Sequence, residues 1–248
     1  MLRAELDRIE RAMASLPTAF QGYPTRMTRD RRMGRTGPFP LKGFYRRFLG
    51  MDRVPVGWRE WMAIPEYHLC SCTNGEVFMD EEGAFSEFRQ ALLGYYPEDV
   101  RRKKIAARCM IMAQAGQYNL PRCLQRGNAV AAMLAAARFS EAALSMTFLL
   151  SRRFMPFYKW AGRLAEKLPV LGSETVATLD ILARTPWTSI DSAMEAVDSI
   201  EKLCSLVAEE LGRQGLCSVQ DNWLWAAGPL VQMGVVDPEL RARNVMED

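Results

Sequence analysis

The stretch that decides the fold is a long apolar segment, AVAAMLAAARFSEAALSMTFLLSRR, which runs from Ala129 to Arg153. Asn128 precedes it, and asparagine is one of the residues that cap helix N-termini. The small residues Ala132, Ala136 and Ala143 allow neighbouring helices to approach closely. The segment therefore predicts one long helix in the core of a helical bundle.

The same segment argues against a membrane protein. Arg138 and Glu141 interrupt it, so no run of about 18 apolar residues remains for a membrane span. Residues 1–11 are rich in charge and lack the apolar centre of a signal peptide. With 49% hydrophobic and 25% charged residues, the composition is that of a globular protein. We therefore expect a cytoplasmic protein that contacts no membrane.

Helical periodicity and helix-ending residues divide most of the remaining chain into helices. Pro97, followed by Glu98 and Asp99, suits the positive end of a helix. A break is predicted at Gly116 and over Tyr118–Pro121, where turn-forming residues gather. Helices are expected over residues 2–16, 44–49, 58–64, 66–72, 84–93, 97–115, 158–168, 173–184, 190–211 and 219–233.

One segment has the pattern of a β-strand. Residues 76–80 alternate in polarity and are followed by a turn at residues 81–83. A lone strand needs a partner for its backbone groups. The predicted fold class is mainly α, a helical bundle with a small remnant β element near the N-terminus. The predicted domains are residues 1–83, the remnant of an α/β domain, and residues 84–248, the helical bundle.

Several common chemistries lack their residues. The six cysteines form no Cys-x-x-Cys pair and His68 is the only histidine, so we expect neither a zinc site nor a histidine-based triad. We expect no disulfide framework in a long chain without an export signal. The glycine-rich phosphate loops, the Gly-x-Ser-x-Gly motif and an Asp-x-Asp pair are all absent from the sequence.

A cluster of basic and amide residues is the first candidate site. Arg101, Lys104 and Arg108 lie on one stripe of the helix that starts at Pro97. Such a cluster can bind a phosphate or another anion through charge-assisted hydrogen bonds. The alternative is a capped helix end with a solvated basic face. The residues predicted to bind substrate or phosphate are Lys103, Lys104, Arg108, Gln117, Tyr118, Arg122 and Lys159.

Glu141 is the candidate catalytic residue, as a general base facing a cleft. The alternative is a structural ion pair with Arg138, three residues earlier on the same helix face. The aromatic stretch at residues 154–160 can stack a planar ring or pack a corner between helices.

Five segments, taken in order, carry a family resemblance. They are Gly75–Asp80, Tyr95–Val100, Lys103–Ala106, Ala113–Arg122 and Pro156–Trp160. Together they resemble the bacterial family called domain of unknown function 4037. The resemblance implies a nucleotidyltransferase-like protein, in which a mixed sheet carries a Gly-Ser turn and paired acids and a helical bundle closes the cleft.

Set against that pattern, we expect the chain to start after the strand that would carry the paired acids, so that this half of the site is absent. Those acids position Mg²⁺ on a triphosphate, so phosphoryl transfer lacks its electrostatic catalyst without them. We therefore expect a nucleotide- or substrate-binding helical portion that is catalytically incomplete. Mg²⁺ and a nucleoside triphosphate are expected only if an upstream segment completes the site.

Two other functions stay open. One is a non-enzymatic interaction module, in which the edge of the strand at residues 76–79 pairs with another protein. The other is nucleic-acid binding through the arginines of residues 26–35, against which the net charge of only +3 argues.

Overall fold

The computed structural model describes residues 2–25 and 38–248. The chain forms two compact units, Met1–Arg53 and Val54–Asp248, which are described separately. The predicted boundary between residues 83 and 84 separates an α/β remnant from a helical bundle, whereas these units are separated by their internal contacts, so that boundary stays a prediction. The arginine-rich segment at residues 26–35 lies outside the described residues.

The first unit holds the small β element. Helix α1 (Leu2–Ser15) leads to a hairpin in which β1 (Ala19–Phe20) pairs antiparallel with β2 (Tyr23–Pro24). The turn residues Gln21 and Gly22 have φ values of 50° and 80°. Two successive positive φ angles are typical of the turn that matches the twist of a two-residue hairpin. Helix α2 (Leu41–Leu49) follows.

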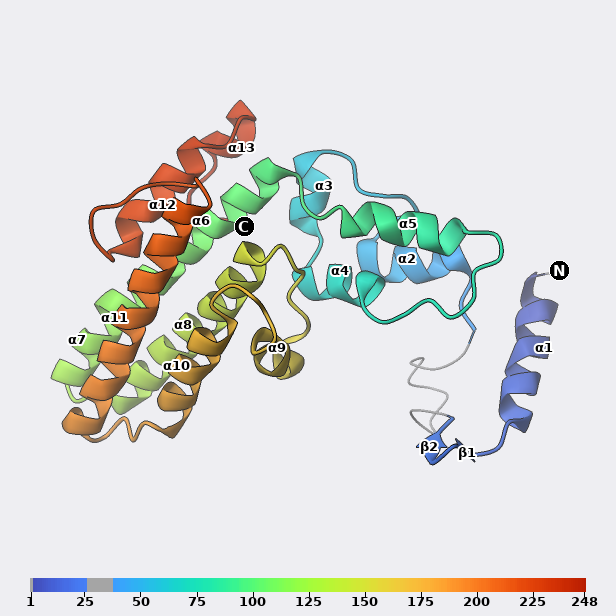
Figure 1. Cartoon of the computed structure of the whole chain (residues 1–248), viewed down its shortest axis with the longest axis horizontal. Coiled ribbons are helices and arrows are strands. Elements are labelled where there is room, and N and C mark those ends of the chain that lie inside the picture. Colours follow the sequence, from blue (N-terminus) through green and yellow to red (C-terminus); the bar gives the residue numbers. More distant parts are fainter. Residues whose placement is uncertain (1, 26–37) are drawn as a thin grey trace. The chain divides into compact units, whose positions relative to one another are not determined.

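The second unit is a helical bundle, and the mainly α prediction is confirmed (Figure 1). Its elements are α3 (Gly57–Ala63), α4 (Glu66–Thr73), α5 (Ala84–Leu93), α6 (Glu98–Met112), the π-helix η2 (Ala113–Asn119), α7 (Leu120–Gln125), α8 (Ala129–Leu150), α9 (Tyr158–Ala165), α10 (Gly172–Arg184), α11 (Ile190–Arg213), α12 (Leu224–Met233) and α13 (Pro238–Ala242).

Helix α8 is the central helix of this unit, as predicted. It packs against α6, α7, α9 and α10. The Asn128 side chain caps it by accepting a hydrogen bond from the amide of Ala131 (3.0 Å). By length and composition alone this helix could cross a membrane, but 61% of its apolar window is buried inside the protein. It therefore has the environment of a core helix.

The strand predicted at residues 76–80 is wrong. The segment forms neither a helix nor a strand in the described structure, and Phe78 is 94% exposed. Hydrogen bonds that involve α5 hold the two ends of this segment instead. Arg89 donates hydrogen bonds to the carbonyl oxygens of Thr73 (2.7 Å) and Gly75 (2.6 Å), and Asp80 accepts one from the amide of Ser86 (2.7 Å). The alternating pattern therefore does not mark a sheet face.

The helix break predicted at Gly116 is also wrong. The chain continues from α6 through η2 into α7. A Cβ atom on Gly116 would lie 2.9 Å from Ile200 Cγ2 and closer still to the ring of Phe139. Gly116 thus permits close helix packing rather than a turn. Pro121 lies in the first turn of α7, where a missing amide hydrogen costs little.

Candidate functional site

The cations of α6 are buried. The residues Arg101, Lys103 and Lys104 are only 1%, 0% and 4% exposed, so the alternative of a solvated basic face is wrong for them. A buried charge is tolerated only when polar partners replace water. Each of these cations therefore has partners from distant parts of the unit.

Arg101 binds the end of α8. Its Nε donates to the carbonyl oxygen of Leu149 (3.0 Å), and its other nitrogens contact Glu98 (3.2 Å) and the side-chain oxygen of Gln214. The last carbonyls of a helix carry partial negative charge, which a cation stabilises. Arg101 is therefore committed to the fold.

Lys103 holds the C-terminal segment, residues 243–248. Its Nζ donates to the carbonyl oxygens of Asn244 (2.8 Å), Val245 (3.2 Å) and Glu247. Burial lowers the pKa of Lys103 to about 8, although the neighbouring Asp248 and Glu247 carboxylates act in the opposite direction. Three oxygens saturate the three donors of an ammonium group, so Lys103 has none left for a ligand.

Arg108, Ser145 and Asp248 line a polar pocket, which we name the Arg108 pocket. The buried Glu66 contacts Ser145 and Arg108 next to this pocket, and Lys104 contacts Glu66. The Nε of Arg108 donates to Ser145 Oγ (2.8 Å), and its Nη2 donates to the Asp248 carboxylate. Ser145 Oγ in turn donates to Glu66 Oε2 (3.2 Å), and Lys104 Nζ lies 3.9 Å from Glu66 Oε1. Arg108, Ser145 and Asp248 line a cavity of about 250 Å³.

Electrostatics in this pocket favour the charged forms of Arg108 and Asp248. Burial disfavours the Arg108 cation, but the carboxylates of Asp248 and Glu66 outweigh burial and raise the pKa of Arg108. Burial also disfavours the Asp248 anion, yet Arg108 and the two lysines hold the pKa of Asp248 below its ordinary value. The two groups therefore form a charged pair at neutral pH.

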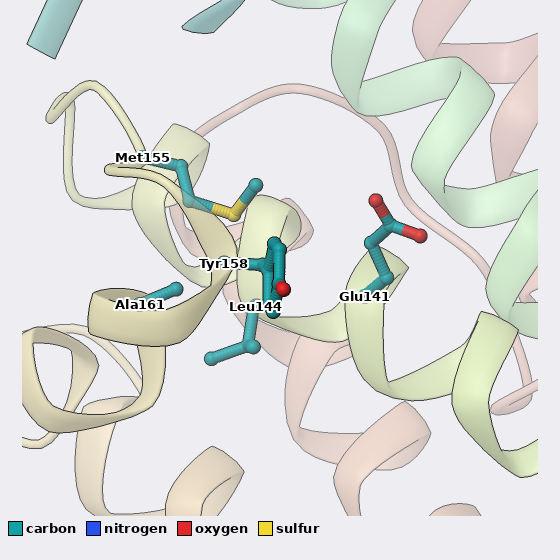
Figure 2. A pocket seen from close by; sticks show the side chains of 5 residues that line it. All are labelled: Glu141, Leu144, Met155, Tyr158 and Ala161. Carbon is teal, nitrogen blue, oxygen red and sulfur yellow. The ribbon is translucent and has the colours of Figure 1, made fainter. Parts of the chain in front are cut away.

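An apolar hollow of about 340 Å³ adjoins the Arg108 pocket and shares Glu141 and Met155 with it. Figure 2 shows the side chains of α8, α9 and the loop between them that meet there. The predicted pair of Arg138 and Glu141 does not form; both side chains are exposed at the cavity rim. Glu141 thus lies beside a cavity, and its role as a general base stays a prediction.

The other predicted residues lie elsewhere. Gln117 is engaged with Glu201 (2.8 Å) and with the backbone before α12. Tyr118 and Arg122 pair with each other through a 2.6 Å hydrogen bond and a ring contact. Lys159 is exposed, with its Nζ 5.4 Å from the ring centre of Trp160. The structure thus brings together Lys104 and Arg108, and separates them from these four.

Sequence reasoning missed two residues that line the pocket, Ser145 and Asp248, and two buried residues near them, Glu66 and Tyr96. Tyr96 is buried, and the Nζ of Lys104 lies 5.6 Å from the centre of the Tyr96 ring. The Tyr96 hydroxyl has no hydrogen-bond partner within the described part of the chain. The one available signal was Ser145, a hydroxyl within an apolar helix. Across residues 2–25 and 38–248, no group of three or more His, Cys, Asp or Glu side chains is arranged to hold a metal ion.

Comparison with known proteins gives one match. Residues 61–161 match the family described as Domain of unknown function (DUF4037), which confirms the resemblance for this segment. No curated protein and no solved structure matches the chain. Apart from Asp248, every residue that we assign to the Arg108 pocket and the adjoining hollow lies within the matched segment.

Proposed function

We propose that the chain binds an anionic small molecule of the nucleotide or phosphate class in the Arg108 pocket, most of which is built by residues 61–161, the segment that matches the DUF4037 family. One observation carries the proposal: a carboxylate, that of Asp248, already lies on Arg108 at the cavity wall. The pocket therefore accepts an anion of the geometry that a ligand would present.

Unused donors support binding of a larger anion. In the described chain, Arg108 Nη1, Lys104 Nζ and the Tyr96 hydroxyl have no hydrogen-bond acceptor. A phosphate offers three acceptor oxygens where a carboxylate offers two, and hydrogen bonds to ionised groups are the strong ones. Of these groups only Arg108 lines the cavity, so a phosphate there can engage the Nη1 donor that Asp248 leaves unused, while Lys104 contributes positive charge and no direct contact.

The charge balance points the same way. Lys104 and Arg108 supply two positive charges, and Glu66 and Asp248 supply two negative ones. If a ligand displaces Asp248, two cations face one carboxylate, which leaves one positive charge for the ligand to neutralise. The adjoining hollow, lined by Leu144, Met155 and Tyr158, can receive an apolar part of the ligand.

Titration calorimetry of the whole chain with pyrophosphate, ATP, GTP, CTP and UTP, each with and without Mg²⁺, tests the proposal. Asp248→Asn removes the competing charge and keeps the side-chain shape, so we expect its affinity for these anions to rise about tenfold, as the loss of one competing charged hydrogen bond implies. Arg108→Gln should abolish binding. Arg184→Gln, in an exposed ion pair far along α10, is the matched control and should bind as the wild type does.

Absence of heat at millimolar ligand for both the wild type and Asp248→Asn would refute the proposal. Equal affinity of the wild type and Arg108→Gln would show that the anion binds elsewhere. A requirement for Mg²⁺ would favour a triphosphate over a simple phosphate, and would support the nucleotidyltransferase-like interpretation.

A second function, protein binding by residues 76–80, is favoured by the exposure of Phe78 (94%) and Met79 (79%) on a segment that forms neither a helix nor a strand. Extended segments without a paired strand can add to a sheet of another chain. Light scattering of the wild type and of Phe78→Ser over a hundredfold concentration range tests whether that chain is a second copy. A monomer throughout would count against self-pairing.

A further inference from the structure

A second cavity, of about 300 Å³, lies where η2 meets the start of α12. Three aromatic rings, those of Tyr118, Trp223 and Trp225, line it together with the amides of Gln114 and Asn119. None of these five residues belongs to the Arg108 pocket, whose walls come from α6, α8 and the C-terminal segment. The cavity is thus a separate feature that the proposed function does not use.

The π-helix is what assembles one wall of this cavity. In an α-helix, residues five apart are rotated by about 140° relative to each other, so Gln114 and Asn119 would face different directions. The i→i+5 hydrogen bonds of a π-helix bring such residues close to one face. Short π-helical segments are rare and occur frequently at functional sites. Here the segment places both amides and Tyr118 on the same cavity.

The opposite wall is held in place by Gln117. Its Nε2 donates to Glu201 Oε2 (2.8 Å) and to the carbonyl oxygen of Asn222 (3.0 Å), while its Oε1 accepts from the amide of Leu224 (3.1 Å). Asn222 also donates to Glu201 Oε2 (2.8 Å). These bonds fix the backbone on both sides of Trp223, so the rings need little ordering when a ligand binds.

The lining groups define the chemistry of a ligand. Within the described chain, the side chains of Gln114 and Asn119 make no hydrogen bond, so each offers an unused donor and acceptor. Aromatic faces stack well on flat rings. Arg122 lies 4.7 Å from the ring centre of Tyr118, and no carboxylate lines the cavity. Asp221, whose Oδ1 accepts a hydrogen bond from the Trp223 amide (3.0 Å), brings a carboxylate close to the same cavity, and the two opposite charges together favour a neutral ligand.

We propose that this cavity binds a neutral planar heteroaromatic ring that carries an amide-like hydrogen-bonding edge. The ring stacks among Tyr118, Trp223 and Trp225, and its edge bonds to Gln114 and Asn119. The site acts independently of the Arg108 pocket.

Nuclear magnetic resonance of the uniformly ¹⁵N-labelled whole chain tests this inference with nicotinamide as the probe, a soluble neutral ring with an amide edge. The chain has six tryptophans, and each gives one indole N–H signal. Trp223→Phe and Trp225→Phe identify the two signals of the cavity. Nicotinamide should shift these two signals and leave the other four in place, whereas tetramethylammonium, a cation of aromatic cages, should shift none.

Two variants complete the test. Asn119→Ala should weaken nicotinamide binding about tenfold, as the loss of one or two hydrogen bonds implies, with an unchanged melting temperature because the side chain is exposed. Arg108→Gln should leave nicotinamide binding unchanged, which separates this result from that of the proposed function. The inference would be overturned if nicotinamide, at a concentration 20 times a dissociation constant of about 1 mM, shifted none of the indole signals. Shifts of all six indole signals, or shifts caused by tetramethylammonium, would also overturn it.

Discussion

Substitution of Gly116 by alanine tests whether helix packing, rather than backbone freedom, explains this glycine. The new methyl group would lie 2.9 Å from Ile200 Cγ2 and at a similar or shorter distance from two atoms of the Phe139 ring. Phe139 and Ile200 are themselves fully buried, so neither side chain has free space into which it can move. Overpacking of a closed core costs about 1–3 kcal/mol.

The helix propensity of alanine acts in the opposite direction by about 1 kcal/mol. With the overpacking cost at the upper end of its range, we expect Gly116→Ala to lower the free energy of unfolding by about 2 kcal/mol. For a chain of this size the melting temperature should fall by roughly 4–8 °C. Urea unfolding of the whole chain, followed by circular dichroism, measures the free energy.

Gly162 supplies the matched control, because it is also helical but a Cβ atom there would have no neighbour within 4 Å. Gly162→Ala should therefore stabilise the protein by up to about 1 kcal/mol. Phe139→Leu should relieve part of the cost of Gly116→Ala, so the double variant should lose less stability than the two single variants added together. If Gly116→Ala is as stable as the wild type, the packing argument is refuted.

Three further predictions concern buried charges and thiols. Burial lowers the pKa of Lys103 to about 8 from an ordinary 10.5, so between these pH values the folded state holds fewer protons than the unfolded state. The free energy of unfolding of the wild type should therefore rise relative to that of Lys103→Met from pH 8 to pH 10. A constant difference between their urea midpoints would contradict this. Burial raises the pKa of the Cys109 thiol well above 9.0, so above pH 9 the thiol ionises in the unfolded state first and the free energy of unfolding falls. The urea midpoint of Cys109→Ala should therefore decline less steeply with pH than that of the wild type. Equal declines would exclude Cys109 as the cause. Glu66→Gln leaves Lys104 and Arg108 with one carboxylate and should lower the free energy of unfolding by about 3 kcal/mol. Asp180→Asn, in the exposed pair with Arg184, is the control and should change it by less than about 0.5 kcal/mol. Similar losses in thermal unfolding would show that burial adds nothing to the contribution of the Glu66 ion pairs.

Local signals in the sequence located most helices. Asn128 caps α8 as its position suggests, and Pro97 precedes α6. The helix predicted at residues 84–93 has the same limits as α5. Such signals succeed because a cap and its helix lie within a few residues, where their hydrogen bonds are formed.

The errors arose where the deciding partner is distant along the chain. Gly116 has the composition of a turn, but its neighbours Phe139 and Ile200 come from α8 and α11. The alternation at residues 76–80 has no strand with which to pair in the part of the chain that the structure describes, and local pattern cannot show whether a partner strand exists. Propensity and pattern are weak priors that tertiary contacts override.

The basic residues of α6 show the same limit for the site. Their spacing predicts that they share one stripe of the helix. It cannot predict that Lys103 binds the carbonyl oxygen of Asn244, because Asn244 lies 141 residues later in the sequence. Spacing along one helix shows which side chains share a face. It does not show whether another segment covers that face, and here the C-terminal segment and α8 both do.

The partners of the pocket also determine which group a ligand can replace. Glu66 is buried at the start of α4, where Ser145, Lys104 and Arg108 surround it, so its removal would strand two cations. The Asp248 side chain is 23% exposed and binds a single cation. The three bonds from Lys103 reach backbone oxygens of residues 244, 245 and 247, and none of them involves the Asp248 carboxylate. An incoming anion therefore needs only a rotation of one side chain at Arg108, while Lys103 keeps the C-terminal segment in place.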